Sequence, residues 1–227
     1  MRLGFATFPE LLDRVDLHLL IPLGATEQHG PHLPLNTDTL IATGVAEAVA
    51  AGRSDVVVAP ALPYGSSGEH SGFPGTLSVG QAALQATVIE LVRSADGFRD
   101  VTLLSWHGGN AEPVARAVAQ LRDEQRLVHL WKPRVESGDA HAGWVETSLM
   151  LALAPALVRD ERPVGATQPV DVLLPRLRQD GVAAVSQNGV LGDARGAAAD
   201  DGEALLEGFV AEIDSLLDSS LSGKADA

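Results

Sequence analysis

The sequence predicts an α/β fold with a mostly parallel sheet flanked by helices in three layers. Three short apolar runs, residues 17–23, 56–62 and 101–106, are typical of strands buried on both faces. Each run ends in a polar, glycine-containing loop, and amphipathic helical patterns lie between the runs. Strands that alternate with helices form βαβ units with parallel strands and right-handed crossovers. Such sheets bind ligands beyond the carboxyl ends of their strands.

The remaining elements follow from the spacing of apolar residues. A helix begins at Thr37 or Asp38, and residues 127–131 would add a fourth strand. Residues 170–177 fit either a helix or a strand. Apolar residues at helical spacing predict further helices over 84–95, 114–121, 146–153 and 203–217. We therefore interpret the whole chain as one domain, with a frayed tail over 221–227.

Composition excludes several classes of function. The chain has 227 residues, 45% of them hydrophobic and 20% charged, which indicates a globular protein. Sixteen Lys and Arg against 30 Asp and Glu give a net charge of -14, which would repel nucleic acid and anionic membranes. Without cysteine, the chain has no thiolate metal site and no cysteine nucleophile. No signal peptide or membrane-length apolar stretch is evident, so we expect a cytoplasmic protein.

Metal-ligating residue types follow the predicted strands. Glu27 and His29 lie two residues apart in an extended segment, so both side chains project to one side and can meet one metal or two adjacent metals. The carboxylate of Asp38, at the start of a helix, can fold back over this loop and bridge two ions. His107 follows the third strand directly and would point into the same crevice, ahead of Asn110, which would cap the next helix.

A later segment adds His141 and Glu146 near the start of another helix. Taken singly, His29 or His107 would be a hydrogen-bonded core histidine, and Asp38 a helix cap. Because these residues follow three predicted strands, they would gather at one edge of the sheet, which favours a functional site instead. A mixed set of imidazoles and carboxylates suits Zn, Mn or Fe(II). The glycines match neither a phosphate-binding nor a dinucleotide-binding fingerprint, which opposes a dinucleotide-binding protein.

Four motifs carry a resemblance to a known family. In chain order they are EQHGPHLPLNTD, GEHSGFPGT, WHGGN and DAHAGWVETS. They resemble the creatininase (creatinine amidohydrolase) family over residues 24–148, and residues 186–193 resemble its C-terminal loop. This resemblance implies a dinuclear metal-dependent amide hydrolase that forms a homo-oligomer, such as a hexamer, and binds two divalent ions (Zn, Fe(II) or Mn) per subunit. The implied metal ligands are Glu27, His29, Asp38, His107 and Glu146, with Asp38 as the bridge; His141 would give a proton to the leaving amine.

One position departs from the founding creatininases. They carry a glutamate two residues after the equivalent of His107, whereas this chain has Gly109, so the second metal would rely on Glu146. The motifs and the short length most resemble the family branch attached to mycofactocin biosynthesis. Enzymes of that branch are peptidases that release a modified C-terminal Val-Tyr unit from a small precursor peptide.

Several further residues are candidates for substrate contacts. Glu69 and His70 could line the substrate pocket. His70 is also a proton-donor candidate, less favoured than His141. His32 either supports the metals or contacts the substrate, or else it has a structural role. Trp144 flanks a site loop and could contact an aromatic substrate. Arg195 is a candidate partner for a peptide carboxylate.

Two other functions stay open at this stage. The chain could hydrolyse a small cyclic amide or formamide, such as creatinine or a formamidopyrimidine. It could also be a catalytically inactive metal-binding scaffold, although every essential family position is occupied by a competent residue.

Overall fold

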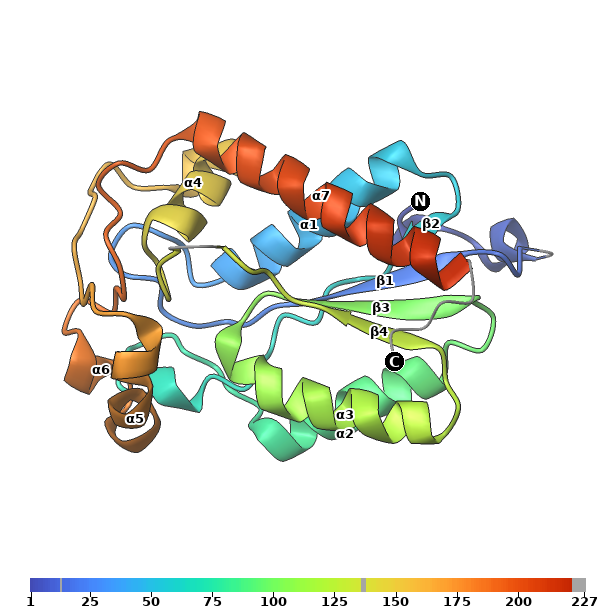
Figure 1. Ribbon diagram of the computed structural model, residues 1–227, viewed down its shortest axis with the longest axis horizontal. Coiled ribbons are helices and arrows are strands. Elements are labelled where there is room, and N and C mark those ends of the chain that lie inside the picture. Colours follow the sequence, from blue (N-terminus) through green and yellow to red (C-terminus); the bar gives the residue numbers. More distant parts are fainter. Residues whose placement is uncertain (13, 136–137, 222–227) are drawn as a thin grey trace.

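Four parallel strands form one sheet between two layers of helices (Figure 1). The computed structural model describes residues 1–12, 14–135 and 138–221. The strands are β1 (His18–Leu23), β2 (Val56–Val58), β3 (Asp100–Ser105) and β4 (Val128–Trp131). The helices are α1 (Thr37–Gly52), α2 (Gln81–Arg93), α3 (Ala111–Asp123), α4 (Trp144–Leu153), α5 (Val170–Asp180), α6 (Val182–Val185) and α7 (Ala199–Leu221). This architecture confirms the predicted single-domain α/β fold.

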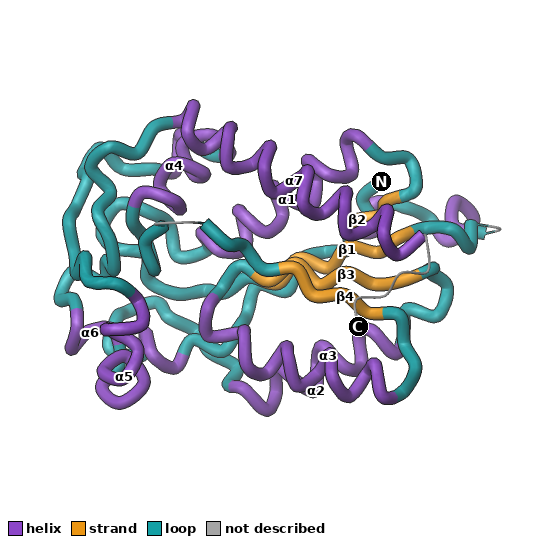
Figure 2. Tube along the Cα trace, in the orientation of Figure 1, coloured by secondary structure: helices purple, strands orange, loops and turns teal. Residues whose placement is uncertain are grey.

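The strand order, β2-β1-β3-β4, places a topological switch point between β1 and β3. From β1 the chain passes through α1 to β2, and it then returns through α2 to β3 on the other side of β1. A right-handed connection that reverses direction places its helix on the opposite face, and α1 and α2 do lie on opposite faces (Figure 2). The loops after β1 and β3 therefore diverge at the carboxyl end of the sheet.

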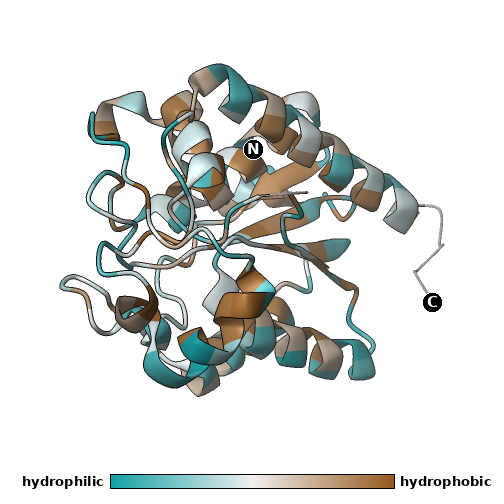
Figure 3. Ribbon diagram, turned by 60° about the vertical axis from the view of Figure 1, so that its left-hand side comes forward, coloured by the Kyte–Doolittle hydropathy of each residue, from teal (hydrophilic) through white to brown (hydrophobic). Residues whose placement is uncertain are grey.

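Each face of the sheet has its own core. Helices α1, α4 and α7 cover one face around Leu104 and Ile213, while α2 and α3 cover the other around Leu103 and Leu121. Leu103 and Leu104 are consecutive residues of β3, so their side chains point to opposite faces, as the period of a strand requires. Hydrophobic colour in Figure 3 gathers on the strands and on the faces of the helices that meet them. This double burial makes the sheet a rigid support for the loops at its carboxyl end.

The predicted second strand, 56–62, is wrong in its second half. The ladder of β2 ends at Val58, and Pro60 follows, which has no backbone N–H to donate. Leu62 rejoins the sheet only through an isolated bridge to Leu23. The chain therefore leaves the ladder early and enters the loop that carries the second group of candidate site residues.

The predicted helices are present, with boundaries that differ by a few residues. The ambiguous segment 170–177 is helical and forms most of α5. The predicted tail lies outside the described residues beyond Leu221, which ends α7. Within the described ranges, no helix combines the length and apolarity needed to cross a membrane.

The predicted capping role of Asn110 is wrong. Its side-chain amide donates to the carbonyl of Gly24 at 3.0 Å, and its side-chain oxygen accepts from the backbone N–H of Ser66 at 2.9 Å. Buried polar groups must find partners, and here the side chain serves the backbone of two other loops. Asn110 thus fastens the loops after β1 and β2 to the end of β3.

Candidate metal centre

Six buried side chains from four segments meet at the carboxyl ends of β1 and β3. The loop after β1 supplies two of them, the first turn of α1 one, the second residue after β3 one, and the segment entering α4 two. They are Glu27, His29, Asp38, His107, His141 and Glu146, each no more than 9% exposed. The structure therefore brings together all the residues for which the sequence predicted metal ligation or proton transfer.

These side chains form three overlapping groups that could each hold a metal ion. In every group, one ligand atom from each residue lies within 4.8 Å of the others. The groups are Glu27, Asp38 and His107; His29, Asp38 and Glu146; and Glu27, His29 and His141. Asp38 belongs to the first two groups, so its two carboxylate oxygens face two separate sets of ligands. A bridging carboxylate requires this placement.

Two of the histidines, His29 and His107, turn their second ring nitrogen toward the carboxylates. The Nδ1–H of His29 donates to the backbone oxygen of Glu27 at 3.1 Å, which leaves its Nε2 3.1 Å from Oδ1 of Asp38. The Nε2–H of His107 donates to the backbone oxygen of Ser66 at 3.0 Å, which leaves its Nδ1 3.1 Å from Oε1 of Glu27. Metal-ligating histidines are oriented in this way by backbone carbonyls. The inner nitrogens are thus positioned to ligate a cation.

Three carboxylate oxygens of the cluster make no hydrogen bond with a described residue, although two of them lie near imidazole nitrogens. Both oxygens of Glu27 and the Oδ2 of Asp38 are buried, and none has a hydrogen-bond partner among the described residues. Burial raises the pKa of Asp38. Burial alone would lower the pKa of His29, but the nearby carboxylates, first that of Asp38, raise it to about 10; the carboxylate of Glu27 likewise raises the pKa of His107 to about 10 against burial. A buried carboxylate without hydrogen bonds is unfavourable, and a bound cation would satisfy it.

Glu146 is fixed by two donors. The indole N–H of Trp106 donates to its Oε1 at 2.8 Å, and the backbone N–H of Ala142 donates to its Oε2 at 2.6 Å. Its Oε2 also lies 3.8 Å from Nε2 of His29. Just upstream, Asp139 accepts from the first backbone N–H groups of α4. This cap orders the turn that carries the carboxylate, and sequence reasoning missed it because Asp139 lies five residues before the amide it caps.

Gly109 explains the departure from the founding creatininases. A Cβ at this position would lie 2.2 Å from the backbone oxygen of Ser66 and 2.4 Å from Oε1 of Glu69. No side chain fits there without displacing the loop after β2. Glu69 occupies this space, with Oε1 3.5 Å from Nε2 of His107. The glutamate in the group with His29 and Asp38 therefore comes from α4, as Glu146, and not from the loop after β3.

Gln28 organises the other two histidines. Its amide nitrogen lies 2.9 Å from Nδ1 of His70 and 3.0 Å from the backbone oxygen of Gly189. Its backbone oxygen accepts from Nε2–H of His141 at 2.8 Å, so Nδ1 of His141 faces Glu27 at 3.9 Å. Sequence reasoning missed Gln28, although its place between two ligands in an extended segment turns it to the opposite side, toward the late loop.

The remaining substrate candidates divide into two pairs. His70 and Glu69 lie at the edge of the cluster, with Nε2 of His70 3.2 Å from Oε1 of Glu27. His32 instead contacts Thr147 at 2.8 Å, and burial lowers the pKa of His32 to about 4. Trp144 points to α7, where its indole N–H donates to Asp201 at 3.3 Å. His32 therefore lies against the first turn of α4, outside the groups that could hold a metal.

Comparison with known proteins places this geometry in a family context. The model of the creatininase family, described as creatinine amidohydrolase, matches residues 5–217. The mycofactocin precursor peptide peptidase of Mycolicibacterium smegmatis is 47% identical over 216 residues, covering 92% of this chain and 87% of the relative. The creatinine amidohydrolase of Pseudomonas putida is 33% identical over 242 residues, covering 90% of this chain and 91% of the relative.

Solved structures agree with these similarities. A crystal structure of creatinine amidohydrolase superposes with a TM-score of 0.81 at 30% identity and covers 96% of this chain and 97% of the other. A creatininase mutant described as Zn-Zn type gives a TM-score of 0.80, also at 30% identity, and covers the same shares of the two chains. The geometry and the similarities thus point to the same chemistry.

Proposed function

The chain belongs to the creatininase family and is an amide hydrolase, and on that premise we propose that it is a peptidase that cleaves a small precursor peptide near its C-terminus. The chain is 47% identical to a mycofactocin precursor peptide peptidase and 33% identical to a creatinine amidohydrolase. The higher identity supports a peptide substrate over creatinine. The product would be the modified C-terminal Val-Tyr unit. We expect the enzyme to act as a homo-oligomer in the cytoplasm.

The metal centre in this proposal holds two divalent ions per subunit. Glu27, Asp38 and His107 would hold one ion, and His29, Asp38 and Glu146 would hold the other. The observations that carry the assignment are the two oxygens of Asp38, which lie 3.1 Å from Nε2 of His29 and 3.6 Å from Nδ1 of His107, and the buried carboxylate oxygens that make no hydrogen bond with a described residue. Imidazole and carboxylate ligands suit Zn, Mn or Fe(II).

The proton transfers in the proposed reaction belong to His141. When bound, divalent ions lower the pKa of water to about 7 and polarise an amide carbonyl. The Nε2–H of His141 stays on the backbone oxygen of Gln28, so its free Nδ1 is the atom that accepts a proton from the attacking water and returns it to the leaving amine. Burial lowers the pKa of His141, which keeps this nitrogen unprotonated at neutral pH.

His70 is less suited to this role. Burial lowers the pKa of His70 to about 3, and its Nδ1 is already engaged by the side chain of Gln28. Its Nε2 lies 3.2 Å from Oε1 of Glu27 without forming a hydrogen bond. His70 would therefore orient the ligand Glu27 and border the substrate. We assign proton transfer to His141.

Mass spectrometry of competing substrates tests the proposed function. Metal-reconstituted enzyme and its Asp38→Ala variant are incubated with the modified precursor peptide, the unmodified peptide, creatinine and a formamidopyrimidine. We expect a C-terminal dipeptide product from the modified peptide, released by the parent alone. Hydrolysis of a small amide without peptide cleavage would contradict the peptidase assignment. Full metal loading with no turnover of any substrate would support a scaffold instead.

A further inference from the structure

Helix α5 has apolar residues on all sides, but the described part of the chain covers only one side. Leu173 and Leu177 pack into a small apolar cluster with Val182, whereas Val172 and Leu174 are 63% and 38% exposed. A helix at the surface of a monomer normally turns polar residues to solvent, and a helix that is apolar all round is buried between neighbours. The sequence of α5 is therefore typical of a helix that is covered on both sides.

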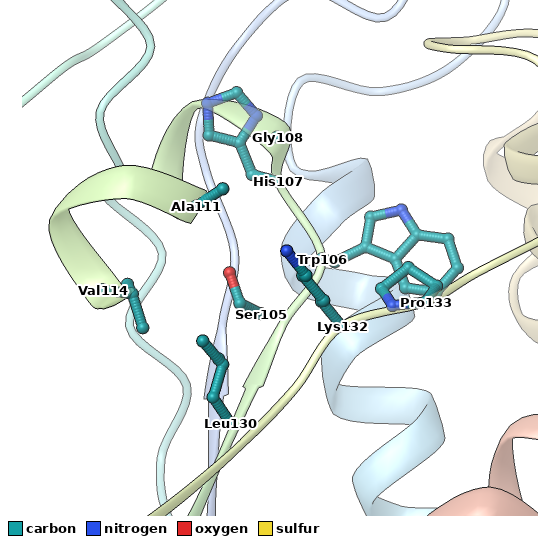
Figure 4. Close-up of a pocket in the computed structure, with 9 residues that line it drawn as sticks. All are labelled: Ser105, Trp106, His107, Gly108, Ala111, Val114, Leu130, Lys132 and Pro133. Carbon is teal, nitrogen blue, oxygen red and sulfur yellow. The ribbon is translucent and has the colours of Figure 1, made fainter. Parts of the chain in front are cut away.

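The position of α5 leaves its second side free. Together with α6, it lies beyond the carboxyl end of the sheet, apart from the two layers of helices (Figure 1). No residue of α5 lines the small pocket beside the metal centre, at the ends of β3 and β4 (Figure 4). Its buried side contacts α6 and the turn Gly68–His70 instead. The exposed side is thus open to another molecule.

The charges on the exposed side of α5 are complementary to those of a second copy of the same helix. Asp171 and Arg178 lie two helical turns apart, so they share this side with Pro175. Both are exposed, and neither forms an ion pair or a side-chain hydrogen bond with a described residue. In an antiparallel pair of α5 helices centred between Leu174 and Pro175, Asp171 of each copy faces Arg178 of the other. A two-fold axis therefore forms both ion pairs at once.

We propose that α5 forms a two-fold interface with α5 of a second copy of this chain, with Pro175 beside the axis and two ion pairs between Asp171 and Arg178. Val172 and Leu174 flank this contact and become buried in it. The apolar residues supply most of the stability, because exposed ion pairs contribute little, while the ion pairs fix the register and the antiparallel orientation. The interface concerns assembly alone and does not depend on the identity of the substrate.

This interface would brace a loop of the metal centre from outside. The turn Gly68–His70, which α5 and α6 contact, carries Glu69 and His70. The backbone at Gly181, between the two helices, lies so close to this turn that a Cβ there would be 2.9 Å from the backbone oxygen of Glu69. A partner that holds α5 in place therefore also limits the movement of the turn.

Disulfide cross-linking of the metal-loaded full chain tests the interface. The chain has no cysteine, so one introduced thiol can pair only with the same residue of another copy. We expect Pro175→Cys to form a covalent dimer under mild oxidation, because the two copies of this residue would be offset by only about 1.5 Å along the helix axes. The change also restores a backbone N–H inside the helix, so it should not disturb α5.

Gln179→Cys is the matched control. Gln179 is exposed on the same helix, but the proposed register places its two copies about 13 Å apart along the axes, beyond the Cα separation of about 7 Å that a disulfide can span. This variant should stay monomeric on non-reducing electrophoresis. Equal cross-linking of the two variants, or none by Pro175→Cys, overturns the proposal.

Charge reversal in the Pro175→Cys background tests the two ion pairs. Asp171→Arg sets like charges against Arg178 of the other copy and should lower the yield of covalent dimer about tenfold at equal protein concentration. Adding Arg178→Asp reverses both charges and should restore the yield. A yield that neither change alters contradicts the proposed register. Because no step of the experiment requires turnover, a failure of the peptidase function would leave this result unaffected.

Discussion

The two ends of the sheet each bury a histidine beside carboxylates, but only at the amino end does each oxygen of the paired carboxylate accept a hydrogen bond. At the amino end, Nδ1 of His18 lies 2.8 and 2.9 Å from the two oxygens of Asp100, and Ser220 donates to Asp100 at 3.1 Å. At the carboxyl end, both oxygens of Glu27 and one of Asp38 have no hydrogen-bond partner among the described residues.

This difference separates a structural histidine from a functional one. A buried His–Asp pair in which both carboxylate oxygens have hydrogen-bond partners holds elements together, here β1, β3 and the end of α7. At the carboxyl end, carboxylate oxygens without hydrogen bonds lie beside inward-facing imidazole nitrogens, and a cation can bind this set in place of the imidazole protons. Residue type and burial are alike at both ends. The two ends differ in whether the buried carboxylate oxygens have hydrogen-bond partners.

The largest expected effect comes from removing the shared carboxylate. Asp38→Ala should lower kcat/KM by about a thousandfold, because metal ions supply several kcal/mol of transition-state stabilisation and both groups lose a ligand. The matched change at the other end, Asp100→Asn, should lower the free energy of unfolding by about 1–3 kcal/mol and leave metal content intact. Kinetics and denaturant titration measure the two effects. Equal losses of activity would contradict the comparison.

Metal removal should destabilise the protein through the carboxyl end. A metal at a hundred times its Kd adds about 2.7 kcal/mol to stability, which corresponds to roughly 5–10 °C in Tm for a chain of this size. We expect chelation to lower the Tm of the parent by this amount. The Tm of Asp38→Ala should not respond to chelator, and a response equal to that of the parent would show that the metal binds elsewhere.

The indole of Trp106 offers a subtler test of the Glu146 ligand. Trp106→Phe keeps a ring beside Phe209 but removes the donor to Oε1 of Glu146, so metal affinity should fall about 10- to 100-fold. Trp131→Phe is the control, since Trp131 also packs on Phe209 but donates to Glu212, outside the centre. Competition with a fluorescent chelator measures both affinities. Similar losses in the two variants would remove Glu146 from the ligand set.

Metal binding should also release protons. In the metal-free protein the pKa values of His29 and His107 are raised to about 10, so both imidazoles are charged at pH 7.5 and must lose a proton to ligate. Because their folded pKa values lie above the unfolded value, their charge stabilises the metal-free fold below about pH 6.5, and this contribution is lost as pH rises through about 10.

The affinity for metal should therefore increase as pH rises from about 6.5 to about 10. Titration calorimetry in buffers with different ionisation heats should count about two protons released per chain on full loading. A count of zero would show that the imidazoles are already neutral or do not ligate.

Local periodicity explains how much of the site the sequence could predict. Glu27 and His29 share a side because a strand-like segment has a period of two, and His107 reaches the crevice because it ends a buried strand. These are properties of neighbouring residues. The same reasoning gave the strands and most helices, apart from the early end of β2 at Val58.

Contacts between distant loops could not be predicted in this way. The carbonyl of Ser66 orients His107 from 41 residues away, and Gln28 reaches Gly189 across 161 residues. Gly189 also adopts a φ of +80°, and a Cβ there would lie 1.8 Å from the side-chain oxygen of Gln28. Such partners depend on how the loops pack in three dimensions, and no local pattern marks them.

The most direct test of the central claim is the metal content of three proteins after equilibrium dialysis, measured by inductively coupled plasma mass spectrometry. The account predicts two divalent ions per chain in the parent and in Asp100→Asn, and a loss of bound metal in Asp38→Ala, because Asp38 serves both groups. A parent that binds no metal would contradict the account, as would an Asp38→Ala variant that binds as much metal as the parent.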